Sequence, residues 1–400
     1  MSFSPPPTPH SRASKEDERR FKTITSTCEW VEDYRPGGYH PIHLGDVFNN
    51  GQYKVIRKLG EGSYSTVWLG RDLCNNRYVA LKFLVSEISR PTEVQILRHI
   101  KNLAPVESPK HITQLLDEFQ HHGPNGIHNC LVFEPMGPSV NTMVEELPQF
   151  KPRKRGMNVR YPPQMAKSIL KQSLLALAFL HDNGIAHGDF QPGNMLFTLN
   201  DIDSTPEDTI RQEEDVLARS ISPPVQRLDG KEDKWAPRYL CMAQPLHIFI
   251  TDPPEKPVTP LGLRAPELIL TGAVDKTLDI WSFGCLIFEL ITGHPLFWAP
   301  GSEYEDDDHL LSLTARLGPL PDELFHTWGV VVEGGEPLVV EQTSMEELFD
   351  RAGPDLEGEE AHNVKALVRS MLQYDPAERP SPTEILANPW FRKIEVQSSL

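Results

Sequence analysis

Apolar and polar positions follow different periods in the two halves of the chain. Between residues 53 and 84, three short runs rich in β-branched and aromatic residues (YKVIRKLG, STVWLG and RYVALKFL) are separated by Gly62-Ser63 and by Cys74-Asn75-Asn76. Such runs between turn residues predict strands joined by hairpins. We expect a helix at PTEVQILRHIKNL, residues 91–103, because Pro91 would fall in its first turn, and a strand that runs into a loop at NCLVFEPMG, residues 129–137.

The second half of the chain has mainly helical spacing. In residues 162–184, apolar side chains recur every three or four positions and Gly184 ends the pattern, which predicts one long helix. Four more helices are expected at TLDIWSFGCLIFELITG, DDDHLLSLTARLG, SMEELFDRAG and EEAHNVKALVRSMLQYD. The pattern therefore predicts an α+β protein with a small β-rich lobe followed by a larger helical lobe.

The composition favours a globular protein in a reducing compartment. Of the 400 residues, 39% are hydrophobic and 24% are charged, which is typical of a folded domain. The net charge of −17 makes nucleic acid an unfavourable partner and suits a basic polypeptide. The five cysteines form no CxxC pair, so we expect neither a disulfide framework nor a zinc site.

The N-terminus and the apolar runs give expectations about location. Residues 1–28 are rich in Pro, Ser and charge and contain no apolar core, so we expect a disordered tail and no signal peptide. No apolar run reaches the length that spans a bilayer. We therefore expect a cytoplasmic or nuclear monomer that binds neither membranes nor nucleic acid directly.

A glycine-rich hairpin is expected at LGEGSYSTV, where Gly60 and Gly62 lie between two predicted strands. Glycine lets a backbone approach phosphate groups closely, and a hairpin can fold over them as a lid. An ordinary glycine-rich hairpin stays the alternative for this pattern taken alone. The residues predicted to contact a nucleotide are Leu59, Gly60, Glu61, Gly62, Ser63, Tyr64, Ser65, Thr66 and Val67.

Lys82 and Glu93 are candidates for a charged pair that binds phosphates. Lys82 falls on the third predicted strand, within VALK, and Glu93 falls near the start of the following helix. A lysine held by an acid can bind the α- and β-phosphates, although either residue alone is more often a solvated surface charge. The segment LVFEPMG then predicts a connector whose backbone contacts adenine at Glu134 and Met136. A core strand followed by a turn is the alternative for that segment.

The stretch HGDFQPGN, residues 187–194, carries the candidate catalytic acid. Phosphoryl transfer to a hydroxyl needs an acid that orients the hydroxyl and accepts its proton, and Asp189 is placed for this role. The amide oxygen of Asn194, five residues later, can bind a magnesium ion. A capping Asp in a loop is the alternative for this motif taken alone.

From about Tyr53 to Phe391 the chain resembles the eukaryotic protein kinases. The resemblance rests on LGEGSYSTV, VALK and HGDFQPGN, together with RAPE, DIWSFG and DPAERPSPTEILANPWF in the second half. Within that superfamily, the segment Asp33–Gly70 is most similar to the SR-protein kinases. Those kinases also carry a spacer at the place where this chain has a polar insertion, at about residues 200–237.

This resemblance implies a two-lobed fold with an antiparallel sheet in the small lobe. The N-lobe would span about residues 53–136, and the mainly helical C-lobe about residues 137–391. Residues 29–52 would form a segment that packs on the kinase domain, which we call the lead-in segment, and residues 392–400 a C-terminal tail. The resemblance also implies ATP and Mg²⁺ as cofactors and Ser/Arg-rich proteins as substrates.

The roles of individual residues follow from the same resemblance. Lys82 and Glu93 would form an ion pair, Asp189 would be the catalytic base and Asn194 would bind the metal ion. Lys82 would also contact the nucleotide.

The resemblance further implies two supporting contacts, and two positions depart from the kinase pattern. Asp279 would hold the backbone of the catalytic loop, and Glu267 would pair with Arg379.

Gly188 replaces an Arg that commonly contacts a phosphorylated activation loop, so control by such a phosphate is not expected. Gln191 replaces a Lys that helps to neutralise the transferred phosphoryl group, and the absence of that positive charge should slow phosphoryl transfer.

The segment after the catalytic loop departs most from the kinase pattern. Kinases carry an Asp-Phe-Gly-like segment whose Asp binds magnesium, and between residues 234 and 267 the only Asp is Asp252. Pro253-Pro254 follows it and restricts the backbone where a flexible Gly is expected. Two interpretations stay open: Asp252 is the metal ligand on a shortened loop, or the metal-binding segment has been lost near Leu246.

Three functions are therefore weighed. The first is an ATP-dependent Ser/Thr protein kinase that transfers the γ-phosphate to Ser in Ser/Arg-rich proteins. The second is a pseudokinase that binds a nucleotide or a partner through an impaired metal site. The third is a small-molecule phosphotransferase, because HGDFQPGN also resembles the loop of aminoglycoside and choline kinases. RAPE and DIWSFG count against the third, and we expect the first.

Overall fold

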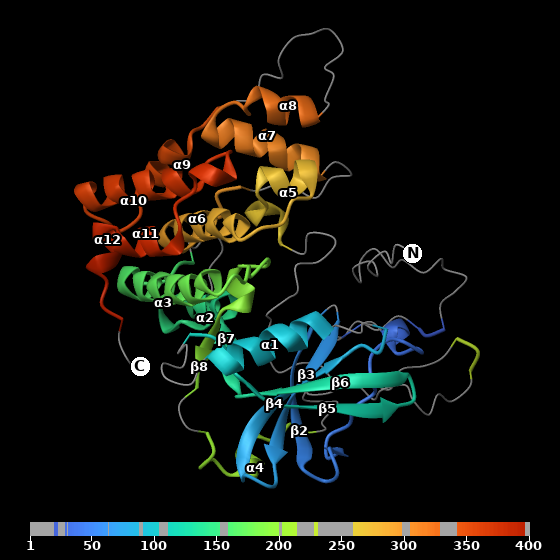
Figure 1. The fold of residues 1–400 in the computed structure, drawn as a ribbon. Helices are drawn as coiled ribbons and strands as arrows, with labels where there is room; N and C mark the ends of the chain where they lie inside the picture. The colour runs from blue at the N-terminus through green and yellow to red at the C-terminus, as the bar shows by residue number, and fades with distance from the viewer. Residues whose placement is uncertain are drawn as a thin grey trace. The chain divides into compact units, whose positions relative to one another are not determined.

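The computed structural model describes residues 20–22, 29, 31–62, 64–87, 91–103, 111–152, 159–199, 202–213, 228–230, 259–297, 305–328 and 342–396. The chain divides into two compact units (Figure 1). The first unit comprises residues 1–108, 113–142 and 195–249, and the second comprises residues 109–112, 143–194 and 250–400. Within the described residues, no helix has the length and apolar character that crossing a bilayer requires.

The first unit is built on a six-stranded antiparallel sheet with the strand order β1-β2-β3-β4-β6-β5. The strands are β1 (Val47–Phe48), β2 (Tyr53–Gly62), β3 (Ser65–Asp72), β4 (Arg77–Leu84), β5 (Leu115–Gly123) and β6 (Gly126–Phe133). Helix α1 (Pro91–Leu103) follows β4. The three strands and the helix predicted between residues 53 and 103 are confirmed. The strand predicted to run into a loop within residues 129–137 is confirmed, since β6 ends at Phe133.

Alternating side chains of the sheet form a buried apolar cluster. The buried members on the strands are Tyr53, Val55, Trp68, Val79, Leu81, Phe83, Cys130 and Val132, and the lead-in segment adds Ile42 and Phe48. Because side chains alternate between the faces of a strand, Lys82 lies on the opposite face of β4 from Leu81 and Phe83. The apolar face of the sheet therefore fixes the face to which Lys82 belongs.

Two further segments complete the first unit. The short strands β7 (Met136–Ser139) and β8 (Leu196–Thr198) pair antiparallel. Residues 202–213, from the predicted polar insertion, contain helix α4 (Glu207–Ile210) and bond to the sheet. Lys54 Nζ on β2 lies 2.9 Å from Glu207 Oε1, and the hydroxyl of Tyr78 on β4 donates to the carbonyl oxygen of Thr205 at 2.8 Å. The start of the insertion is thus bound to β2 and β4 of the first unit, whereas the sequence predicts it as part of the larger lobe.

The second unit is helical in its described part. Its helices are α3 (Pro163–Asp182), α5 (Pro266–Thr271), α6 (Thr277–Thr292), α7 (Glu305–Leu317), α8 (Asp322–Trp328), α9 (Met345–Ala352), α10 (Gly358–Met371), α11 (Pro382–Ala387) and α12 (Pro389–Arg392). Helix α2 (Val140–Glu146) leads into it from the first unit. All five helices predicted in the second half are confirmed. The short helices α5, α8, α11 and α12 were not predicted.

Helix α6 is the centre of the second unit. It is buried on almost every side and contacts α3, α9 and α10. A helix that is apolar all round belongs in a core, which explains the near-continuous apolar run of its sequence. Helix α3 instead buries one stripe, made of Ala166, Ile169, Leu170, Leu174, Leu177 and Leu180. These contacts fix the position of Asp279, which lies in the first turn of α6.

Candidate active site

Lys82 and Glu93 form a buried ion pair in the first unit. Lys82 Nζ lies 2.6 Å from Glu93 Oε1, and the two side chains are only 4% and 1% exposed. Glu93 is the third residue of α1, where an acidic side chain is also favoured by the helix dipole. The spacing of eleven residues therefore suffices for the pair, and this predicted contact is confirmed. The other oxygen of Glu93, Oε2, is buried without a hydrogen-bond partner among the described residues.

The glycine-rich hairpin lies next to Lys82 in the same sheet. Strands β2 and β3 pair Gly60 with Val67 and Gly62 with Ser65, and Val67 in turn pairs with Lys82 on β4. The predicted nucleotide-binding residues Leu59–Gly62 and Tyr64–Val67 therefore form the two sides of one hairpin beside the ammonium group. Ser63, at its tip, lies outside the described residues.

The predicted adenine-contacting residues, Glu134 and Met136, lie where β6 ends and β7 begins. Phe133 ends β6, is buried, and pairs with Ala80 on β4. Glu134 follows it with an exposed side chain, and Met136 begins β7 with a buried one. The connector therefore starts on the strand beside β4, so the structure places it in the same unit as Lys82 and the hairpin.

In the second unit, two amide groups hold the Asp189 carboxylate. Gln191 Nε2 donates to Asp189 Oδ1 at 2.6 Å, and Asn194 Nδ2 donates to Asp189 Oδ2 at 2.8 Å and to its carbonyl oxygen at 2.9 Å. Asn194 ends a short 3-10 helix, Pro192–Asn194. Burial raises the pKa of Asp189, while the hydrogen bonds from Asn194 and Gln191 and the nearby His187 act in the opposite direction. The geometry fixes both carboxylate oxygens of the candidate base.

Asp279 supports the backbone of this loop, as predicted. Its Oδ2 accepts hydrogen bonds from the backbone N–H of His187 at 2.8 Å and lies 2.9 Å from His181 Nε2. Its Oδ1 accepts from the N–H of Gly188 at 2.9 Å. The three contacts join the start of α6, the end of α3 and the residues just before Asp189, so Asp279 holds the loop through its main chain.

Gly188 has a backbone conformation that suits glycine. Its φ angle is +76°, in the left-handed region that costs residues with a Cβ about 1–2 kcal/mol. Its carbonyl oxygen accepts a hydrogen bond from Thr259 Oγ1 at 2.9 Å. Sequence reasoning missed Thr259, because 71 residues separate it from Gly188 and no local pattern marks the contact.

Glu267 and Arg379 form the second predicted support. Arg379 Nη1 and Nη2 donate to Glu267 Oε1 and Oε2 at 2.5 and 2.8 Å, and the two side chains are 0% and 10% exposed. The guanidinium group also lies 5.0 Å from the ring centroid of Trp281 on α6. Paired donors and acceptors in this geometry make a strong, directional contact between α5 and the segment before α11.

The metal ligands are only partly covered by the described residues. Asn194 lies beside Asp189, whereas Asp252 lies outside the described residues. Within the described ranges, no group of three or more His, Cys, Asp and Glu side chains is arranged to hold a metal ion. Magnesium needs few protein ligands when phosphate oxygens supply the others, so the amide oxygen of Asn194 fits that ion.

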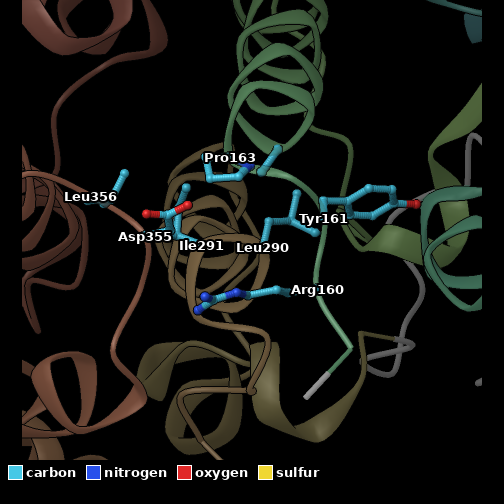
Figure 2. A pocket seen from close by; sticks show the side chains of 8 residues that line it. Arg160, Tyr161, Pro163, Leu290, Ile291, Asp355 and Leu356 are labelled. Carbon is cyan, nitrogen blue, oxygen red and sulfur yellow. The ribbon is translucent and has the colours of Figure 1, made fainter. Parts of the chain in front are cut away.

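A small pocket in the second unit is separate from these residues. It lies between the start of α3, the end of α6 and the segment at Asp355 and Leu356, with Arg160 and Tyr161 at its wall (Figure 2). Its volume of about 10 Å³ leaves space for about one water molecule. The pocket is therefore too small for a nucleotide.

The fold and these residues define a class of protein. One unit carries a buried Lys–Glu pair beside a glycine-rich hairpin, and the other carries a fixed carboxylate with an adjacent amide oxygen. Such groups bind phosphates and accept a proton from a hydroxyl, which are the tasks of a phosphotransferase.

Comparison with known proteins identifies the family. A family model for the protein kinase domain matches residues 53–205 and 251–391. The chain is 30% identical to a serine/threonine protein kinase of Aspergillus fumigatus, with 97% of this chain and 95% of the relative covered. It is 32% identical to the serine/threonine-protein kinase SRPK of Physarum polycephalum, with 92% of each chain covered. It is 26% identical to protein kinase dsk1 of Schizosaccharomyces pombe, with 92% of this chain and 85% of the relative covered. The chain belongs to the protein kinase family.

Proposed function

We propose that this protein is an ATP-dependent serine/threonine kinase that transfers the γ-phosphate to Ser in Ser/Arg-rich proteins. The observation that carries the proposal is the geometry of Asp189, whose two carboxylate oxygens are held by Gln191 and Asn194 while Asp279 fixes the backbone before it. A base fixed in this way orients a substrate hydroxyl and accepts its proton.

Each remaining group has a separate task in this reaction. The ammonium group of Lys82, oriented by Glu93, binds the α- and β-phosphates of ATP, and the hairpin around Gly60 and Gly62 covers them. The connector at Glu134 and Met136 contacts adenine. Asn194 and Asp252 would hold magnesium, which would supply positive charge that neutralises the phosphate oxygens.

The substrate class follows from charge and from the relatives. A net charge of −17 favours a basic peptide over nucleic acid, and an Arg/Ser repeat is such a peptide. A relative with 92% coverage carries the name SRPK, which agrees with the similarity of the lead-in segment to SR-protein kinases. We propose in addition that the protein acts as a monomer in the cytoplasm or nucleus, without direct contact with membranes.

The direct test is transfer of radiolabelled phosphate from ATP and Mg²⁺ to a synthetic Arg/Ser-repeat peptide. We expect transfer by the wild-type protein and a loss of at least about a hundredfold in Asp189→Ala, because general-base assistance contributes about that much. Asp182→Ala is the matched control, since Asp182 is an exposed Asp at the end of α3. Equal transfer by Asp189→Ala and Asp182→Ala would reject Asp189 as the base.

Two further arms test the metal site and the substrate class. Metal-dependent turnover that disappears in Asp252→Ala supports Asp252 as the magnesium ligand. Wild-type protein that binds ATP but shows no turnover would instead identify a pseudokinase. Phosphate transfer to an aminoglycoside or to choline, without transfer to the peptide, would identify a small-molecule phosphotransferase.

A further inference from the structure

The lead-in segment is bonded directly to the glycine-rich hairpin. The hydroxyl of Tyr39 donates to the carbonyl oxygen of Gly62 at 2.8 Å, one residue before the hairpin tip. A tight turn aims this side chain, because the N–H of Tyr39 donates to the carbonyl oxygen of Asp33 at 3.0 Å. Gly38 is required inside the turn, since a Cβ there would lie 1.8 Å from the Asp33 oxygen.

A second contact reaches the same hairpin through Lys58. Lys58 on β2 is fully buried, and its Nζ forms ion pairs with Glu29 of the lead-in segment and, at 3.1 Å, with Glu61 of the hairpin. The hydroxyl of Tyr34 donates to the other oxygen of Glu29. Burial opposes ionisation of Glu29, but the charge of Lys58 and these hydrogen bonds outweigh it and lower its pKa to about 2. The Glu29 carboxylate therefore holds the ammonium group of Lys58 beside Glu61.

Aromatic packing joins the same elements. Tyr34 and Tyr39 lie with ring centroids 5.6 Å apart and form a buried cluster with Val85, which directly follows β4. Tyr64, from the hairpin turn, packs against this cluster, and its carbonyl oxygen accepts a hydrogen bond from the N–H of Val85 at 2.9 Å. The residues on either side of the hairpin tip, Gly62 and Tyr64, are thus held by a hydrogen bond and an apolar contact, and Glu61 is held by an ion pair.

We propose that Tyr39 and Glu29 are positioning residues for the nucleotide: they hold residues 61, 62 and 64 of the glycine-rich hairpin in the position from which the hairpin covers the phosphates. This inference rests on the proposed kinase function. Neither residue is expected to touch the reacting atoms. They act through Gly62 and through Lys58 with Glu61, so their loss weakens ATP binding and leaves the peptide site unaffected.

The first test is Tyr39→Phe, with Tyr78→Phe as its matched control. Both tyrosines are 3% exposed, and each hydroxyl donates to a backbone carbonyl oxygen at 2.8 Å, but Tyr78 bonds to Thr205, away from the hairpin. We expect Tyr39→Phe to raise the KM for ATP about three- to tenfold, the equivalent of one hydrogen bond. The KM for the peptide and the values for Tyr78→Phe should stay within about twofold of wild type.

The second test compares Glu29→Gln with Glu207→Gln. Each carboxylate pairs with a lysine of β2, Lys58 for Glu29 and Lys54 for Glu207, and only the first pair reaches the hairpin. We expect Glu29→Gln to raise the Kd for ATP about tenfold or more and Glu207→Gln to leave it unchanged, because the first carboxylate is buried and the second partly exposed.

Hydrogen exchange supplies a readout that does not depend on catalysis. The amides of residues 61–67 should exchange faster in Tyr39→Phe and Glu29→Gln than in the two control variants, even if the wild-type protein transfers no phosphate. Exchange and ATP affinity that are the same in the test and control variants would overturn the inference. If the wild-type protein transfers no phosphate but the test variants still exchange faster than the controls, the proposed function is rejected and the role of the hairpin contact is not.

Discussion

Replacing Arg379 by Met should destabilise the second unit more than any exposed ion pair does. The substitution removes both hydrogen bonds to Glu267 and leaves its carboxylate, 10% exposed, without its charged partner. It also removes donors from the carbonyl oxygens of Gln373 and Thr277. Breaking a buried pair in this way costs about 3–5 kcal/mol. The melting temperature should therefore fall by roughly 10 °C.

The assay is thermal and urea denaturation of three variants. Arg369→Met is the control, because Arg369 pairs with Glu346 on the surface, where the side chains are 32% and 37% exposed, and such a pair contributes under about 1 kcal/mol. Adding Glu267→Gln to Arg379→Met should recover part of the loss, since no unpaired charge then stays buried. Equal losses for Arg379→Met and Arg369→Met would refute the reasoning.

The same substitution should reduce catalysis, because the pair is linked to the catalytic loop by a chain of contacts. Glu267 lies at the start of α5, and Arg264, three residues earlier, donates to the carbonyl oxygen of Thr259 at 2.9 Å. Thr259 in turn donates to Gly188, next to Asp189. We expect kcat to fall while the KM for ATP is unchanged. An unchanged kcat in a destabilised protein would show that this chain does not position the base.

Three other substitutions test the catalytic loop. Asp279→Asn removes one acceptor oxygen, so at least one backbone N–H loses its hydrogen-bond partner, at a cost of about 1–3 kcal/mol. Hydrogen exchange of the His187 and Gly188 amides should therefore become faster. We also expect kcat to fall while the KM for ATP is unchanged. Gly188→Ala should lower the free energy of unfolding in urea by about 1–2 kcal/mol, and a neutral result would contradict the strain expected at φ +76°. Gln191→Lys should raise kcat several-fold, because a cation near the transferred phosphoryl group stabilises its negative charge. The control is Gln172→Lys on α3. Equal kcat values for the two variants would show that a cation at position 191 does not assist phosphoryl transfer.

The sequence predicted the elements whose pattern is local. Strands β2, β3 and β4 are rich in β-branched and aromatic residues and are separated by clear turn residues, and the sequence of α6 has the spacing of a helix. Strand β5, with the sequence LLDEFQHHG, was missed because it lies at the sheet edge, where half-exposed positions carry polar side chains. The short helices α11 and α12 begin with proline and span six and four residues, too few for a helical period to be visible.

Site residues that belong to a sequence motif could be predicted, whereas contacts between residues far apart in the chain could not. Lys82 lies on a strand and Glu93 on the helix that directly follows it, so a stretch of eleven residues was enough to predict their ion pair. The contacts Tyr39–Gly62 and Thr259–Gly188 join segments 23 and 71 residues apart through one hydroxyl each. Many residues can supply a hydroxyl, so only the folded backbone shows which of them is close enough to donate.

Gly188 and Gln191 together change the way in which the catalytic loop holds its acid. Both positions commonly carry a cation in the kinase pattern, and here neither side chain is charged, so amide donors hold Asp189 and burial raises its pKa. A carboxylate with a raised pKa is a stronger base, which suits proton removal from a serine hydroxyl. The uncharged Gln191, however, contributes no full positive charge to the phosphoryl group in the transition state. In the proposed reaction that charge has to come from Lys82 of the first unit and from magnesium, which Asn194 of the same loop would help to hold.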